Sequence, residues 1–250
     1  NHLQSASRVI NPKNTLPILD NFLFKLEGQK LEITASDLET TLVTNIMLEN
    51  ASDEGTVAIP ARILTESLKE FSDQPLAFDI NTDNYNIVIS SENGQFSIMG
   101  LNGDDFPLLP QIKKEKEVSF VATSEALLSG ISNTIFAAAE DELRPVMNGI
   151  FFELTDKALN FVASDAQKLV RYKRLDIKAE ESGASFILPR KPASILKSIL
   201  AKEQDQIRVS FDDKNAFFTF SDYRLVCRLV EGVYPSYNSV IPVNNPNKLI

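Results

Sequence analysis

Apolar residues at every second position recur along most of the chain. Such alternation over a few residues is typical of a β-strand with one buried face. It occurs in Phe22/Phe24/Leu26, Leu31/Ile33/Ala35, Ile87/Ile89, Phe96/Ile98, Ile150/Phe152/Leu154, Leu159/Phe161/Ala163, Val209/Phe211, Phe217/Phe218/Phe220 and Leu225/Cys227/Leu229. The pattern therefore predicts many short, half-buried strands.

Three segments have helical spacing instead: residues 61–71, 124–139 and 192–201. Pro192 lies in the first turn of the last segment, where a helix tolerates proline. The three apolar stripes consist of Leu64, Leu68 and Phe71; of Leu127, Leu128, Ile131 and Ile135; and of Ile195, Leu196, Ile199 and Leu200. Because strands outnumber helices, we predict an α+β protein with helices on one face of antiparallel sheets.

The chain also contains an internal repeat. The segment LPILDNFLFKLEGQKLEITASDL, from Leu16, aligns without gaps with RPVMNGIFFELTDKALNFVASDA, from Arg144. Self-similarity of this length indicates repeated structural units. The identical pairs include Pro17/Pro145, Phe24/Phe152, Leu26/Leu154, Leu31/Leu159, Ala35/Ala163, Ser36/Ser164 and Asp37/Asp165.

The repeat predicts two copies of one domain, over residues 1–115 and 116–243. The second copy opens with a predicted strand, VSFVA, and half a helix, whose counterparts in the same alignment would precede Asn1. We therefore expect the first copy to lack its opening strand. We expect residues 244–250 to begin a third copy.

Composition narrows the class of protein. The chain has 250 residues, 43% of them hydrophobic and 24% charged, and 25 Lys and Arg against 34 Asp and Glu give a net charge of −9. No run approaches the roughly 18 apolar residues of a membrane span, so we expect a cytoplasmic protein that does not enter a membrane. The single cysteine excludes an internal disulfide framework, and the single histidine excludes most zinc sites and histidine-based triads.

Catalytic motifs are absent, so carboxylates are the remaining catalytic candidates. Asp37 and Asp165 each follow a predicted strand in an ASD sequence, where an acidic residue most often caps a turn. A metal-dependent nuclease site is the alternative. Other acidic clusters are Asp104/Asp105, Asp212/Asp213 and Glu140/Asp141/Glu142. We interpret Cys227 as a core residue, assign no function to His2, and expect no cofactor or metal.

Basic residues lie opposite the apolar stripes of two predicted helices. Arg62 and Lys69 lie on the first helix, and Arg190 and Lys197 lie at the same positions of the repeat. The outward face of the 124–139 helix offers Ser129, Ser132, Asn133 and Ala137, which carry no charge. Repeated cations in an acidic chain indicate contacts with a phosphate backbone, although a solvated helix face is the alternative.

Several sequence segments resemble the bacterial sliding clamp family, the beta subunit of DNA polymerase III. The resemblance extends along the whole chain, in order. The matching segments are TLPIL from Thr15, ASDLE from Ala35, IPAR from Ile59, FPLLP from Phe106, MNGIFFE from Met147, ILPRK from Ile187 and VEGVYPSYNSVIP from Val230. The resemblance implies a DNA-clamp fold of three tandem domains per chain, with two chains closed head to tail into a ring around double-stranded DNA.

The resemblance implies a processivity factor without a catalytic site of its own. Because such a ring holds DNA by topology, few and weak phosphate contacts leave it free to slide. The positions that fall where the family meets DNA are Lys13, Arg62, Lys69, Arg144, Arg190 and Lys191. Lys197 joins them on the repeat argument.

The resemblance also implies a pocket that binds short apolar peptides. The expected partners are the DNA polymerase III alpha subunit, the clamp loader, other polymerases and mismatch-repair proteins. The matching positions are Met147, Ser164, Ala166, Gln167, Lys168, Leu169 and Pro242. Ala166, Gln167 and Lys168 replace the family's usual glycine, histidine and arginine, which changes the expected peptide preference. Met147 and Leu169 could alternatively belong to the core.

The last implied site is the seam between subunits. The segment QFSIMGL, from Gln95, resembles the strand that pairs with the other subunit of the homodimer, with Phe96 and Ile98 at the interface. Phe96 could alternatively be a core residue. We expect residues 1–250 alone not to close a ring. The rival functions are a carboxylate-dependent nuclease or hydrolase and a structural β-repeat module without a role on DNA.

Overall fold

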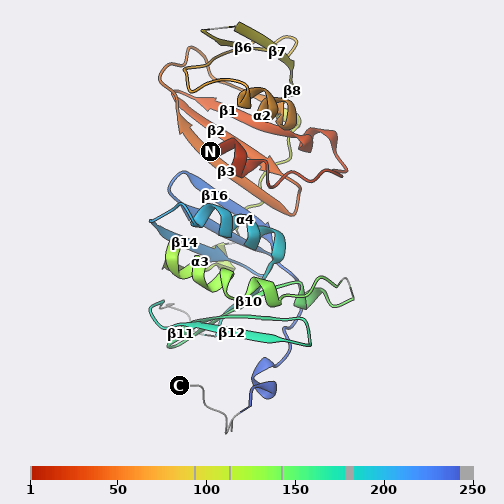
Figure 1. Ribbon diagram of the computed structural model, residues 1–250, viewed down its shortest axis with the longest axis vertical. Coiled ribbons are helices and arrows are strands. Elements are labelled where there is room, and N and C mark those ends of the chain that lie inside the picture. Colours follow the sequence, from red (N-terminus) through yellow and green to blue (C-terminus); the bar gives the residue numbers. More distant parts are fainter. Residues whose placement is uncertain (1, 93, 113, 142, 178–182, 243–250) are drawn as a thin grey trace. The chain divides into compact units, whose positions relative to one another are not determined.

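The computed structural model describes the chain except for residues 1, 93, 113, 142, 178–182 and 243–250 (Figure 1). Residues 1–112 and 217–227 form one compact unit, and residues 113–216 and 228–250 form a second. No helix among the described residues has the length and apolar character needed to cross a membrane.

The first unit consists mainly of antiparallel strands. Its larger sheet has the strand order β8-β4-β1-β2-β3-β16, and a smaller sheet has the order β5-β6-β7. Both agree with the predicted α+β class. The strands are β1 (Asn21–Glu27), β2 (Lys30–Ser36), β3 (Thr40–Met47), β4 (Gly55–Pro60), β5 (Ala77–Ile80), β6 (Asn86–Ser91), β7 (Gly94–Met99), β8 (Leu101–Asn102) and β16 (Tyr223–Arg228).

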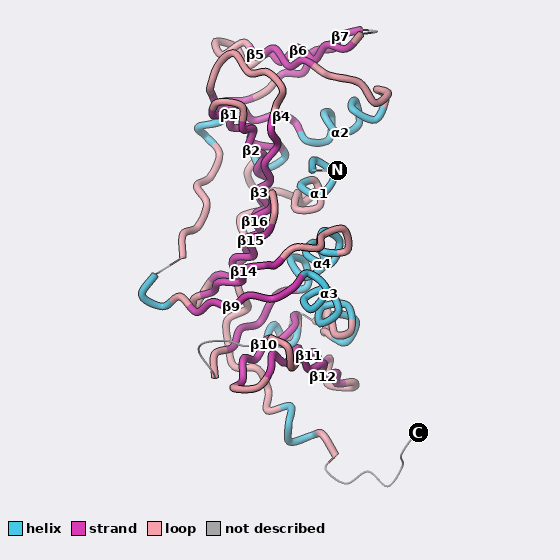
Figure 2. Tube along the Cα trace, turned by 90° about the vertical axis from the view of Figure 1, so that its left-hand side faces the viewer, coloured by secondary structure: helices cyan, strands magenta, loops and turns pink. Residues whose placement is uncertain are grey.

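Two helices cover one face of the larger sheet in this unit. The helix α1 (His2–Ala6) packs on β2 and β3, and α2 (Ala61–Lys69) packs on β1 and β4, on the same side of the strands (Figure 2). Short 3₁₀ helices occur at η1 (Pro17–Asp20) and η2 (Gly103–Asp105). The His2 ring stacks on Tyr223 at 5.3 Å and its Nδ1 lies 2.6 Å from Thr44 Oγ1, so His2 helps to hold α1 on the sheet.

The second unit has the same type of construction. A four-stranded sheet has the order β12-β11-β10-β13, β14 pairs with β9, and helices α3 and α4 pack against each other over these strands (Figures 1 and 2). The elements are η3 (Lys114–Lys116), β9 (Val118–Thr123), α3 (Ser124–Ser132), η4 (Ile135–Ala137), η5 (Pro145–Met147), β10 (Gly149–Thr155), β11 (Ala158–Ser164), β12 (Leu169–Arg174), β13 (Ser185–Pro189), α4 (Arg190–Leu200), β14 (Gln206–Phe211) and η6 (Tyr237–Val240). The strand β15 (Asn215–Phe220) begins in this unit, and its residues from Phe217 on are counted with the first unit.

The sequence repeat reappears as a repeat of strand register. In the first unit Phe24 pairs with Ile33 across the β1–β2 hairpin, and in the second Phe152 pairs with Phe161 across β10–β11. The sequence alignment matches Phe24 with Phe152 and Ile33 with Phe161, so both pairs occupy equivalent positions. The hairpin that carries the ASD sequence is therefore formed in the same way in both units.

The predicted helix over residues 124–139 is wrong in its second half. α3 ends at Ser132, because Asn133 Nδ2 donates to the carbonyl of Ser129 and Thr134 Oγ1 donates to that of Gly130, which satisfies carbonyls of the last turn. A separate 3₁₀ turn, η4, follows. Ala137 lies in this turn and is fully buried, so it does not belong to an outward helix face.

Aromatic residues form the core of the second unit. Phe152 is fully buried between Phe161 and Phe186, with ring centroids 4.7 and 4.6 Å away. Gly130 in α3 faces Phe161, and a Cβ at this position would lie 2.4 Å from the ring. The close approach of α3 to β11 therefore depends on glycine. Cys227 in β16 is buried, which confirms its prediction as a core residue.

Candidate nucleic-acid interface and adjoining pocket

The helix α2 presents cations on its exposed face. Ala61 and Leu64 are buried against the sheet, whereas Arg62 and Lys69 are exposed. The Arg62 side chain is 87% exposed, and its Nε lies 3.0 Å from Glu66 Oε1, one turn further along the helix. The helix is shorter than predicted, since Phe71 lies beyond it and stacks on Phe96 at 5.4 Å.

The helix α4 buries its apolar residues, including Ala193, Leu196 and Leu200, and exposes Lys197. Lys191 is half-buried. Arg190 begins the helix and differs from Arg62 in its surroundings: its side chain is only 33% exposed, and its guanidinium contacts residues outside α4.

The difference between these two arginines follows from strand register. Pro60 pairs with Asn21 in the first unit, whereas Pro189 pairs with Gly149 in the second. Gly149 is the counterpart of Asn21 in the repeat, but Pro189 lies one position beyond the counterpart of Pro60. Each helix begins directly after its proline, so Arg62 is the second residue of α2 and Arg190 is the first residue of α4.

The helix α3 contains no lysine or arginine, and its one charged residue is neutralised from β12. Arg174 forms ion pairs with Glu125 of α3 and with Asp176, both at 2.8 Å. Hydrogen bonds from Arg174 hold the pKa of both carboxyls below their usual values. This face of the second unit therefore presents no unpaired acid from α3.

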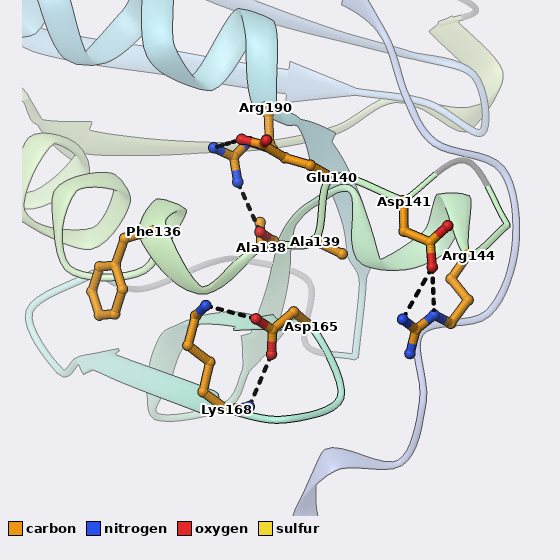
Figure 3. Close-up of a pocket in the computed structure, with 9 residues that line it drawn as sticks. All are labelled: Phe136, Ala138, Ala139, Glu140, Asp141, Arg144, Asp165, Lys168 and Arg190. Carbon is orange, nitrogen blue, oxygen red and sulfur yellow. Dashed lines mark hydrogen bonds and ion pairs between the residues drawn. The ribbon is translucent and has the colours of Figure 1, made fainter.

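A hollow of about 340 Å³ lies in the second unit and brings together residues that are far apart in the sequence (Figure 3). Two of the predicted DNA-binding residues, Arg144 and Arg190, line it together with Lys168 of the predicted peptide site. Its other lining residues are Phe136, Ala138, Ala139, Glu140, Asp141 and Asp165. Each of its three cations has a carboxylate partner.

The two arginines of this hollow are held by different means. Arg190 Nη2 lies 2.6 Å from Glu140 Oε1, and its Nη1 donates to the carbonyl of Ala138 at 2.7 Å (Figure 3). Arg144 binds Asp141 through Nη2 at 3.0 Å and through Nε at 3.1 Å. The backbone amide of Leu143, and then Arg144, hold the pKa of Asp141 below its usual value. The sequence indicated Glu140 and Asp141 only as an acidic cluster.

Asn148 connects the two arginine sites. Its Oδ1 accepts a hydrogen bond from the backbone amide of Asp141, and its carbonyl accepts one from the backbone amide of Arg190. The next residue must be glycine, because a Cβ at Gly149 would lie 2.4 Å from the carbonyl oxygen of Leu188. The Asn-Gly pair after Met147 therefore fixes the loop of Asp141 against the start of α4.

The two ASD sequences form the same turn. Asp37 Oδ1 accepts hydrogen bonds from the amides of Glu39 and Thr40, and Asp165 Oδ1 accepts them from Gln167 and Lys168. Lys168 Nζ adds an ion pair at 2.6 Å, and these contacts, the Lys168 side chain first, lower the pKa of Asp165. Turn capping is therefore confirmed for both carboxylates. In the described parts of the chain, His, Cys, Asp and Glu do not group as they would around a metal ion.

Ala166 stands in this turn with a φ of +75°, a conformation that favours glycine. We expect Ala166→Gly to raise the stability of the second unit by up to about 1 kcal/mol, since relief of about 1–2 kcal/mol of strain exceeds the entropy lost to glycine. Thermal unfolding should show a higher Tm. The control is Ala201→Gly. Ala201 is exposed and has a φ of −62°, which is unstrained for alanine, so this change should lower the Tm. A Tm lowered equally by both changes would contradict the expectation.

The other residues predicted for the peptide pocket lie around this turn. Ser164 Oγ donates to the carbonyl of Lys168, and Ala166 and Gln167 are exposed. Leu169 packs against a cluster formed by Val162, Ile187, Tyr234 and Tyr237, together with Val146 and Ile241. Met147 is half-buried in η5 and Pro242 is exposed. Leu169 is thus partly a core residue, as the alternative held, but it keeps an accessible side.

Two tyrosines of this cluster, Tyr234 and Tyr237, hold the segment 230–241 on the sheet of the second unit. Tyr234 stacks on Phe151 at 4.8 Å, and Tyr237 Oη donates to Glu153 at 2.5 Å. Burial raises the pKa of both tyrosines to about 12. At Tyr237 the hydrogen bond to Glu153 and the charge of this carboxylate also raise the pKa. Arg171 Nη1 donates to Asn238 at 3.1 Å.

Two further predicted sites lie in the first unit. Lys13 is exposed in the loop before η1. The strand β7 pairs only with β6 among the described strands, so its other side is an edge. Phe96 on this strand is half-buried against Phe71, whereas Ile98 is only 3% exposed and faces the interior of its own unit.

These features define a tandem α+β protein, in which helices over antiparallel strands carry cations. Models of the N-terminal and central domains of the DNA polymerase III beta subunit match residues 1–110 and 122–236. The chain therefore belongs to the DNA polymerase III beta subunit family.

Named relatives agree with this assignment. The beta sliding clamp of Pseudomonas aeruginosa is 28% identical over 241 residues, covering 96% of this chain and 65% of the relative. That of Staphylococcus epidermidis is 26% identical, covering 100% and 67%. The chain thus spans about two thirds of the length of these relatives.

Solved structures agree as well. A crystal structure of the DnaN sliding clamp from Pseudomonas aeruginosa bound to griselimycin superimposes with a TM-score of 0.90 at 27% identity, covering 98% of this chain and 66% of that one. The DNA polymerase III beta subunit of Thermotoga maritima superimposes with a TM-score of 0.86 at 29% identity, covering 97% and 65%.

Proposed function

We propose that this protein is a sliding clamp, a processivity factor that encircles duplex DNA and tethers the replicative polymerase in the cytoplasm. The observation that carries the proposal is the exposure of Lys69 on α2 and Lys197 on α4 in a chain of net charge −9. A few cations in an acidic protein are suited to weak contacts with phosphates. Such contacts do not distinguish one DNA sequence from another, and they permit sliding. Arg62, Arg144, Arg190, Lys191 and Lys13 would add to these contacts.

The apolar cluster around Leu169 supports a second role, the binding of short apolar peptides from polymerases, the clamp loader and repair proteins. Leu169 and Ile241, which pack against the cluster, are partly exposed, the exposed Pro242 follows Ile241, and Met147 follows Val146 of the cluster in η5. A relative has been crystallised with griselimycin. A partly exposed apolar surface of this kind suits linear peptides with a few hydrophobic anchors.

The free edge of β7 supports a homodimer in which this strand pairs with a second subunit. An exposed strand edge invites pairing and is normally covered or blocked. Phe96 would pack at this seam. Ile98 would not contact the other subunit directly but would support the strand from the interior, since its side chain is buried in its own unit.

The geometry does not favour the catalytic alternative. A nuclease would need Asp37 and Asp165 to hold metal ions or water, but each carboxylate accepts hydrogen bonds from the backbone amides two and three residues further along its turn. Such bonds satisfy the carboxylate oxygen and fix the turn. We therefore propose an accessory protein and not an enzyme.

The test is topological. We expect the complete gene product, loaded by its clamp loader and ATP on a nicked circular plasmid, to remain on the circle and to leave after a single restriction cut. Streptavidin bound to biotin at both new ends should restore retention, because it blocks the ends without changing the binding surface. Equal retention on circular and open linear DNA would show ordinary affinity and contradict the proposal, as would no retention on either.

A further inference from the structure

Each of the two arginines at the start of an exposed helix is paired with a carboxylate. Arg62 Nε lies 3.0 Å from Glu66, and Arg190 Nη2 lies 2.6 Å from Glu140. The two pairs arise differently, since Glu66 lies on the same helix and Glu140 follows η4 in the preceding loop (Figure 3). The pairing therefore recurs although the register around the helices differs by one position.

The lysines on the same helices are different. Among the described residues, no carboxylate lies within ion-pair distance of Lys69 or Lys197. Both lysines are exposed and can meet a phosphate directly. At Arg62 and Arg190 a phosphate must instead compete with a carboxylate that already contacts the guanidinium, at Nε of Arg62 and at Nη2 of Arg190.

This competition lowers the net gain of a phosphate contact. An arginine binds a phosphate strongly and with fixed geometry, which suits a static complex better than a sliding one. A carboxylate that touches the same guanidinium competes for it, and it also repels the phosphate. The side chains of Glu66 and Glu140 are 59% and 76% exposed, so an approaching phosphate can displace them.

We infer that Glu66 and Glu140 lower the affinity of the protein for DNA. They hold Arg62 and Arg190 in exchangeable ion pairs and so keep the contacts with phosphates weak enough for sliding. The inference rests on the proposed function and adds a role for acidic residues within it. Asp141, the partner of Arg144, is not assigned this role, because it also accepts a hydrogen bond from the backbone amide of Leu143 and holds its loop.

The test measures the affinity of the complete gene product for a duplex oligonucleotide over a range of salt concentrations. We expect Glu66→Gln and Glu140→Gln each to tighten binding roughly fivefold, because a carboxylate that competes with the phosphate at short range is removed. Each should also steepen the plot of log K against log salt by about 0.9, since one more phosphate is neutralised. On long DNA, the loaded double variant should diffuse more slowly.

Matched controls separate this effect from net charge. Asp83→Asn and Asp156→Asn remove the same charge from exposed turns away from the helices and should change affinity by less than about twofold. Glu66→Gln should have a much smaller effect when Arg62 is already Gln, because only the direct repulsion between Glu66 and the phosphate then remains. Unchanged Tm values would exclude a general loss of structure.

Two results have different meanings. If Arg62→Gln and Arg190→Gln do not weaken binding, and Lys69→Gln and Lys197→Gln do not either, these helices do not meet DNA and the proposed function loses its support. The arginine variants could weaken binding while the glutamate variants leave affinity and salt slope unchanged. The proposed function would then be retained, and the inference that Glu66 and Glu140 lower the affinity for DNA would be wrong.

Discussion

Reversal of Arg62, Lys69, Arg190 and Lys197 to glutamate is expected to reduce DNA binding and clamp loading by about 100-fold or more at physiological salt. Four attractive contacts become repulsive, and each contact is worth about 1 kcal/mol at close range in water. The salt dependence of residual binding should fall by about 0.9 for each lost contact. Loading by the clamp loader on nicked circles and duplex affinity over a salt series measure both effects.

The control is an equal change of charge elsewhere. Reversal of four exposed lysines on strands and turns, Lys30, Lys157, Lys173 and Lys214, adds the same negative charge away from the helices. Because charges further apart than a Debye length are screened, this variant should lose much less binding. Similar losses in both variants would mean that net charge, and not the helix faces, governs DNA binding. No loss in either would favour the structural β-repeat module.

Phe152→Ala is expected to lower the free energy of unfolding of the second unit by about 3–5 kcal/mol. The Phe152 ring is fully buried and packs between Phe161 and Phe186, so its removal leaves a cavity that the rigid sheet cannot close. Urea denaturation followed by far-UV circular dichroism measures the loss. Should the alanine variant not fold, Phe152→Leu retains most of the volume and should cost less than about 1.5 kcal/mol.

The matched control for this core substitution is Phe136→Ala. Phe136 belongs to the same unit but is 60% exposed, so its truncation should change stability by no more than about 0.5 kcal/mol. Comparable losses at positions 136 and 152 would contradict the assignment of the aromatic core.

Alternating segments were predicted well because one buried face gives a strand a period of two positions. The hairpins β1–β2 and β10–β11 were found in this way, and so was their repeat. The strand Thr40–Met47 was not predicted. Its first half is buried on both faces, so apolar and polar residues do not alternate there. The end of α3 was missed because side chains of Asn133 and Thr134 close the last turn, and an apolar stripe does not record such bonds.

The sequence by itself determined the repeat, the α+β class, the turn-capping aspartates and the family, because these depend on local patterns and on ordered motifs. Only the tertiary structure decided which charges meet. Glu140 and Arg190 lie far apart in the sequence, and Asn148 joins their segments through hydrogen bonds that no spacing predicts. It also decided that Ile98 is buried and that Arg62 and Arg190 occupy different helical positions. The physical reason is that ion pairs and close approaches depend on distances of a few ångströms between segments, which are set by packing and register.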